Sequence, residues 1–164
     1  MSRSRATLAR PRCGPTHGGL FGFSEIPLYR LELLRDLGAA VAVDAACLDA
    51  EQVDYVNLHG TATPANDVAE GMAIAAIMGR ETPCSSTKGF TGHTLGAAGI
   101  LETVIAYLAV ERGLMPASLN TREIDPAIDI NILLENRVGD VHRVMTNSFG
   151  FGGSNASLLI GRSS

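Results

Sequence analysis

The sequence contains no tryptophan, and only 5% of its 164 residues are aromatic, which argues against an aromatic-rich binding surface. Charged residues make up 18% and apolar residues 46%, a balance that excludes intrinsic disorder for most of the length. No apolar run approaches the roughly 20 residues that a bilayer-spanning helix needs. The net charge of −4 argues against nucleic acid as the main partner. These absences leave a soluble, cytoplasmic α/β protein as the expectation.

Cysteine and lysine are also scarce. The three cysteines are an odd number without CxxC spacing, so neither a disulfide framework nor a zinc site is expected. Of the 13 basic residues only Lys88 is a lysine. Because arginine and lysine are not interchangeable at a chemical site, a single lysine within a glycine- and histidine-rich segment is a candidate functional residue.

Two regions differ in organisation. Residues 1–23 are rich in arginine, lack acids and show no periodicity, so we expect a disordered or non-native tail. Residues 24–164 form the expected domain, in which strands and helices alternate, as is typical of an α/β fold. We expect strands at Val53–Leu58, Thr82–Thr87, Val144–Ser148 and Ser154–Ile160. Helices are expected at Ser24–Leu37, Asn66–Met78 and Leu95–Arg112.

The second and third helices carry interpretable sequence signals. The helix over 66–78 is rich in alanine, and its predicted apolar side contains Val68, Met72 and Ala75. Gly113 follows the third helix and is expected to end it.

Three loops combine glycine with chemically active side chains. They are HGTATP over 59–64, KGFTGHTLG over 88–96 and NSFGFGGSN over 147–155. Loops at strand ends are where α/β folds usually bind ligands. The third loop lacks the GxGxxG order and a following helix, so phosphate binding is a poor interpretation of it. Each loop alone is weak evidence, whereas the set is specific.

The segments HGTATPAND, KGFTGHTLGAAG and NSFGFGGSNAS, in this order, resemble the C-terminal half of β-ketoacyl-acyl carrier protein synthases of the thiolase superfamily. The resemblance covers roughly Asp49 to Arg162. It implies the C-terminal half of a layered α-β-α-β-α fold, with one mixed sheet and packed helices. It also implies an acyltransferase that condenses malonyl-acyl carrier protein with an acyl thioester in fatty-acid, polyene or polyketide biosynthesis.

The resemblance assigns roles to four residues. His59 and His93 match the two catalytic histidines, which donate hydrogen bonds to the malonyl thioester oxygen as CO2 leaves. One such donor lowers the barrier by roughly 3–4 kcal/mol. Lys88 matches the active-site lysine, and its charge would keep a neighbouring imidazole neutral. Glu70 matches a buried glutamate that pairs with this lysine, as a buried cation requires a counter-charge.

Further residues and partners follow from the same resemblance. Thr61 and Thr63 match threonines that bind the pantetheine arm. The loop containing Phe149, Gly150, Phe151 and Gly152 resembles the gate of the acyl pocket, with a core aromatic as the alternative for Phe151. The expected partners are acyl carrier protein, an N-terminal ketosynthase half, and a homodimer or heterodimer mate. No metal or organic cofactor is expected, since phosphopantetheine arrives on the carrier protein.

The catalytic cysteine is the missing part. Cys47 lies in VDAACLD, which superficially resembles the family's cysteine elbow, but Leu48 and Asp49 replace small hydroxyl residues and the following acid would raise the thiol pKa. We therefore identify no nucleophile in this chain. Three interpretations stay open: part of a condensing enzyme that is inactive alone, a non-catalytic partner similar to a chain-length factor, and a truncated gene product.

Overall fold

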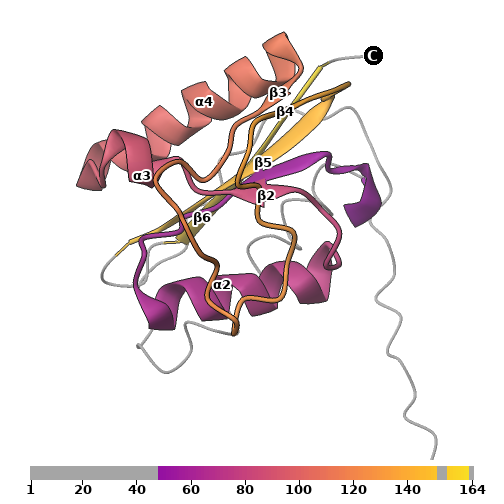
Figure 1. Cartoon of the computed structure of the whole chain (residues 1–164). Coiled ribbons are helices and arrows are strands. Elements are labelled where there is room, and N and C mark those ends of the chain that lie inside the picture. Colours follow the sequence, from indigo (N-terminus) through magenta and orange to yellow (C-terminus); the bar gives the residue numbers. More distant parts are fainter. Residues whose placement is uncertain (1–47, 151–154, 163–164) are drawn as a thin grey trace, which may run out of the picture.

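The computed structural model describes residues 48–150 and 155–162, and these form three layers (Figure 1). The middle layer is a four-stranded sheet in the order β2 (Cys84–Ser85), β1 (Tyr55–Asn57), β5 (Arg143–Phe149) and β6 (Asn155–Gly161). β1 is parallel to β2 and β5, whereas β6 is antiparallel to β5. Helices α2 (Pro64–Ile77) and α4 (Ala98–Arg112) cover opposite faces of the sheet. The mixed sheet with packed helices confirms the predicted α/β class.

Alternation along the strands divides the core into two clusters. Val56 and Met145 pack with Ile74 on the side of α2. Their neighbours Tyr55 and Val144 pack in a separate cluster on the side of α4. Because successive strand residues point to opposite faces, one short strand can supply both clusters. The sheet is therefore buried on both sides, as parallel sheets usually are.

The ends of the two long helices follow from their local sequence. Pro64 is the first residue of α2, where its missing N–H costs nothing. The last turn of α4 ends at Gly113, which has a left-handed conformation with φ of 62°. The helix expected at Leu95–Arg112 is present, except that its first turn is the 3-10 helix η3 (Leu95–Ala97). The predicted stop at Gly113 is confirmed.

Two expectations about elements are wrong. Lys88 was expected in a loop, whereas it begins the one-turn helix α3 (Lys88–Thr91). On α2, the residues that face the sheet include Glu70, Ala73 and Ile74, while Met72 is 67% exposed. The alanine-rich sequence gives a weak periodic signal, so contacts with the sheet, rather than helix amphipathicity, determine which face is buried.

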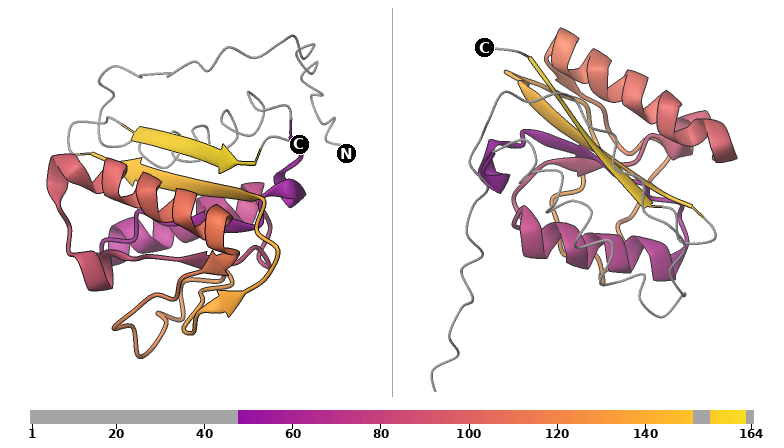
Figure 2. Two further views of the ribbon diagram at one scale, coloured as in Figure 1. Left: turned by 90° about the horizontal axis from the view of Figure 1, so that it is seen from above. Right: turned by 180° about the vertical axis from the view of Figure 1, so that it is seen from behind.

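Smaller elements connect the layers. The 3-10 helix η2 (Ala50–Gln52) precedes β1, and β3 (Leu114–Met115) pairs antiparallel with β4 (Arg137–Val138) beside the main sheet. Figure 2 shows that α4 lies along β5 and β6, and it contacts both strands. Within the described ranges, no helix is both long and apolar enough to cross a bilayer. The expected tail at 1–23 and helix at 24–37 lie outside the described residues.

Candidate active site

His59 and His93 meet where β1 ends and the segment before α4 begins. Their ring centroids are 5.4 Å apart and the rings are nearly perpendicular, at 85°. His59 is 4% exposed, whereas His93 is exposed to solvent. The expected proximity of the two imidazoles is therefore confirmed. The fold encloses the His59 ring, whereas the His93 ring faces solvent.

The backbone fixes the orientation of the His93 ring. The amide N–H of Leu95 donates to His93 Nδ1 at 3.3 Å. A nitrogen that accepts a hydrogen bond carries no proton, so in the neutral ring the proton is on Nε2. His93 thus presents an N–H donor on the side of the ring away from its own backbone.

Glu70 holds the backbone around His59. Its carboxylate accepts hydrogen bonds from the amide N–H groups of His59 and Gly60, both at 2.9 Å. It also accepts one from the side-chain amide of Asn147 at 3.1 Å. Burial raises the pKa of Glu70, while these three hydrogen bonds and the charge of Lys88 act in the opposite direction. The carboxylate acts as an anchor for the turn that carries His59.

The predicted ion pair between Lys88 and Glu70 is wrong. The ammonium of Lys88 instead binds the carboxylate of Glu102 on α4, and both side chains are buried. The oxygens of Glu70 are occupied by N–H donors, so its link to Lys88 is a longer-range electrostatic attraction. Burial raises the pKa of Glu102, and Lys88, His93 and Ser148 oppose this shift. An acid therefore lies close to His93, which was not expected from the sequence.

The other candidate residues surround these histidines. Thr61 and Thr63 share a hydrogen bond of 2.9 Å between their hydroxyl groups at the start of α2. The ring of Phe149 packs edge-on against His59, with centroids 5.3 Å apart. Gly150 directly follows β5 and is exposed. Phe151, Gly152 and Cys47 lie outside the described residues.

Sequence reasoning missed Glu102 and Asn147. Glu102 interrupts the apolar run AGILETVIAYLAV, and a lone acid within an apolar run of a helix is a signal for a buried, paired charge. Asn147 lies inside a recognised motif, but no local pattern indicates that its side chain reaches α2. Only the sheet register, which places β5 beside β1, brings these groups together.

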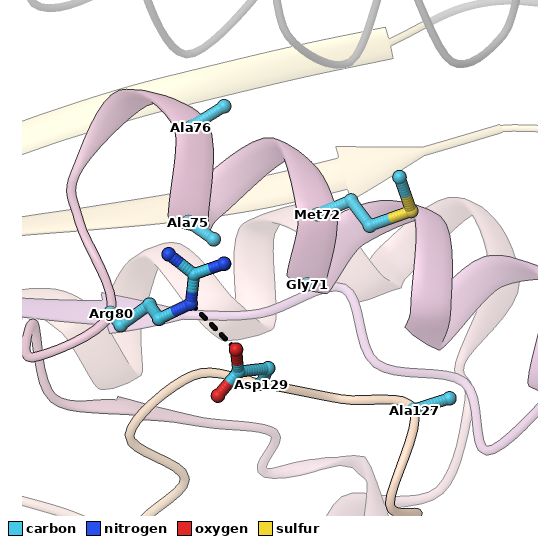
Figure 3. Close-up of a pocket in the computed structure, with 7 residues that line it drawn as sticks. All are labelled: Gly71, Met72, Ala75, Ala76, Arg80, Ala127 and Asp129. Atoms are coloured by element: carbon cyan, nitrogen blue, oxygen red, sulfur yellow. Dashed lines mark hydrogen bonds and ion pairs between the residues drawn. The ribbon is translucent and has the colours of Figure 1, made fainter.

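Two other features lie apart from this cluster. Cys84, the one cysteine among the described residues, is fully buried, and burial raises its pKa, which makes it a poor nucleophile. A hollow of about 250 Å3 lies between α2 and the segment around residue 128 (Figure 3). Arg80 Nε donates to Asp129 there at 2.6 Å, and neither histidine lines the hollow.

Comparison with known families decides the membership of the chain. The family model described as the C-terminal domain of β-ketoacyl synthases matches residues 36–122. The chain belongs to the β-ketoacyl synthase family. A 3-oxoacyl-[acyl-carrier-protein] synthase 1 from Escherichia coli (strain K12) is 46% identical over 110 residues, covering 66% of this chain and 27% of that protein.

Solved ketosynthases have the same fold. A β-ketoacyl synthase from Burkholderia phymatum matches with a TM-score of 0.77 and 40% identity, covering 81% of this chain and 33% of that one. The ishigamide ketosynthase/chain length factor matches with a TM-score of 0.78 and 33% identity, covering 81% and 34%. The fold is thus that of the C-terminal part of a thiolase-like ketosynthase. The chain spans about a third or less of the length of these relatives.

Proposed function

We propose that this chain supplies the decarboxylating part of a β-ketoacyl-acyl carrier protein synthase site. The observation that carries the proposal is the approach of the His59 and His93 rings to 5.4 Å on two family motifs. In the proposed step, malonyl on a carrier protein loses CO2, and the electrons of the broken C–C bond form a thioester enolate. Both imidazoles donate N–H hydrogen bonds to the enolate oxygen, and these hydrogen bonds stabilise the developing negative charge.

The enolate carbon then attacks the carbonyl of an acyl group held as a thioester on the catalytic cysteine, which this chain does not supply. The new C–C bond forms, the C–S bond breaks, and the cysteine leaves as a thiolate. Neutral imidazoles suit this chemistry because each donates a hydrogen bond to the enolate oxygen without transferring its proton. In the proposal, Lys88 compensates the negative charge of the Glu102 carboxylate, which lies near His93. The reaction needs no metal, and the phosphopantetheine arm arrives on the substrate.

Substrate binding is assigned to the residues around the two rings. The paired hydroxyl groups of Thr61 and Thr63 lie on the loop that carries His59, where they suit an amide-rich pantetheine arm. Phe149 contacts the His59 ring, and we assign it with Gly150, Phe151 and Gly152 to an acyl-pocket gate. The main partner is then acyl carrier protein, together with the rest of the ketosynthase fold and a dimer mate.

We further propose that the chain alone does not condense substrates. The chain covers 33% of the length of a solved relative, and the described part offers only the buried Cys84 as a thiol. Purified chain mixed with acyl- and malonyl-carrier protein should give no ketoacyl product. Product formation that Cys47→Ser abolishes would contradict both this proposal and the exclusion of Cys47 as a nucleophile.

A chimera tests the function directly. In the Escherichia coli relative, the matched segment is replaced by residues 48–162 of this chain, and release of CO2 from malonyl-carrier protein is measured. His59→Ala and His93→Ala should each lower kcat by about 100-fold or more, because each removes a transition-state donor. The matched control is His142→Ala, an exposed histidine paired with Asp140, which should leave the rate within about twofold.

The second candidate is a non-catalytic partner similar to a chain-length factor. It is favoured by the similarity to the ishigamide ketosynthase/chain length factor. A folded, dimeric chimera that releases no CO2 would support this candidate and overturn the decarboxylating role. A rate that is indifferent to both histidine substitutions would also overturn that role.

A further inference from the structure

A chain of buried and half-buried hydrogen bonds runs from the β6 edge of the sheet to the His59 turn. On β6, the Ser157 hydroxyl donates to the side-chain oxygen of Asn147 at 2.8 Å. The Asn147 amide then donates to Glu70 at 3.1 Å, and Glu70 accepts the backbone N–H groups of His59 and Gly60. Asn147 and Ser157 lie directly opposite each other in the β5–β6 register, so the first link is a cross-strand pair.

Glu70 depends on these donors because burial removes its carboxylate from solvent. It is 1% exposed, and a buried carboxylate is stable as an anion only when its oxygens are hydrogen-bonded or paired with a cation. The groups facing it are the His59 turn, Asn147 on β5, Cys84 on β2 and the more distant charge of Lys88 on α3. Asn147 is the only side-chain N–H among the hydrogen-bond donors to Glu70 that the described residues provide.

β5 therefore supports His59 from two directions. Asn147 acts on the backbone of the turn through Glu70, and Phe149, two residues further along the strand, packs against the ring. Residues i and i+2 of a strand point to the same face, so both side chains project from β5 toward the same turn.

We propose that Asn147, held by Ser157, is a positioning residue that keeps the Glu70 carboxylate against the His59–Gly60 backbone and so orients the His59 imidazole. The inference rests on the proposed function for its catalytic meaning, but the network can be tested without activity. The ionised carboxylate accepts these three N–H groups more strongly than the protonated form does. Removing the Asn147 donor disfavours the charged form, so Glu70 should protonate at higher pH.

The first test is a pH titration of the 164-residue chain by NMR, following the amide protons of His59 and Gly60. In Asn147→Leu, which has a similar shape without polar atoms, the midpoint should rise by about one pH unit or more. Ser157→Ala should raise the midpoint by a smaller amount. This variant replaces Asn147→Leu as the test if Asn147→Leu does not fold. The matched control is Thr146→Val, because the buried Thr146 hydroxyl has no hydrogen-bond partner in the described structure.

The second test is the decarboxylation rate of the chimera as a function of pH. Asn147→Leu should lower kcat about tenfold or more with little change in KM, and should move the acidic limb to higher pH. The positioning role would be overturned if Asn147→Leu left both the NMR midpoints and the acidic limb of the pH–rate profile unchanged. If the chimera still lost activity on His59→Ala, the proposed function would stand. Shifted NMR midpoints in a chimera without decarboxylation would support the network and overturn the proposed function.

Discussion

Two buried glutamates, Glu70 and Glu102, divide the electrostatic roles around the histidines. Glu70 receives N–H donors and fixes the turn of His59, whereas Glu102 receives the ammonium of Lys88. Their carboxylates lie on helices on opposite faces of the sheet, α2 and α4. Lys88 at the start of α3 is thus tied to α4, which begins a few residues after His93.

At the residue scale, Glu102→Gln should lower the free energy of unfolding by about 3–5 kcal/mol, because it leaves the Lys88 ammonium buried without a counter-charge. The measurement is urea unfolding of the chain. Glu111→Gln is the matched control on the same helix, since Glu111 is half-exposed and 3.9 Å from Arg112. It should cost about 1 kcal/mol at most. Equal effects of the two substitutions would show that Lys88 is solvated.

Tyr55 should make the fold sensitive to alkali. Burial raises the pKa of its phenol, whose hydroxyl lies 2.5 Å from Ser85 Oγ. The folded state therefore favours the protonated form, and stability present below about pH 10 is lost as the pH rises above that value. Cys84, whose pKa burial also raises, should contribute loss of the same sign from about pH 8.5.

Tyr55→Phe separates these contributions. It should cost about 1 kcal/mol at pH 7 through the lost hydrogen bond, and its urea midpoint should fall less between pH 9 and pH 11 than that of the wild type, because only the Cys84 contribution remains. Urea midpoints measured between pH 7 and pH 11 check this. A wild-type midpoint that falls no faster than that of the variant would contradict the account.

Glu70 and Glu102 show most clearly what the sequence could not predict. The sequence was sufficient to predict that His59 and His93 lie together, because both belong to long motifs at element ends. It was insufficient to predict the partner of Lys88, because Glu70, Glu81 and Glu102 all lie within 18 residues of it and pairing depends on which helix face turns inward. The functional roles of the histidines, Thr61, Thr63 and the Phe149 loop stay predictions.

At the scale of elements, the long helices and paired strands were predictable, and α3 was not. Pro64 and Gly113 mark helix ends in the sequence itself. α3 is a single turn whose existence depends on tertiary contacts: a Cβ atom at Gly89 would lie 2.1 Å from the carbonyl oxygen of Leu119. The side-chain amide of Asn120 also donates to the Gly89 carbonyl at 2.6 Å.

Gly89→Ala should therefore displace α3 and lower the free energy of unfolding by about 1–3 kcal/mol or more, because backbone on both sides must move. The matched control is Gly96→Ala, where a Cβ would meet no atom within 4 Å and the change should stay within about 0.5 kcal/mol. Thermal and urea unfolding measure both variants. A neutral Gly89→Ala would mean that α3 is not fixed against this segment.

At the scale of the whole molecule, the outer face of α4 is the feature that the described residues leave uncovered. Ile100, Val104, Tyr107 and Leu108 are 42–65% exposed on one side of this helix. A helix that is apolar on all sides is normally buried, so this face suits contact with more protein. The proposed function supplies an occupant, the remaining two thirds of the ketosynthase fold.

The central claim is that His59 and His93 converge on one substrate oxygen. The most direct measurement is a crystal structure of the chimera with a malonyl thioester mimic that cannot lose CO2. We predict that both imidazole N–H groups lie about 2.7–3.1 Å from the same thioester oxygen, with the Lys88–Glu102 pair intact beside His93. A thioester oxygen bound by one imidazole or neither would contradict the account.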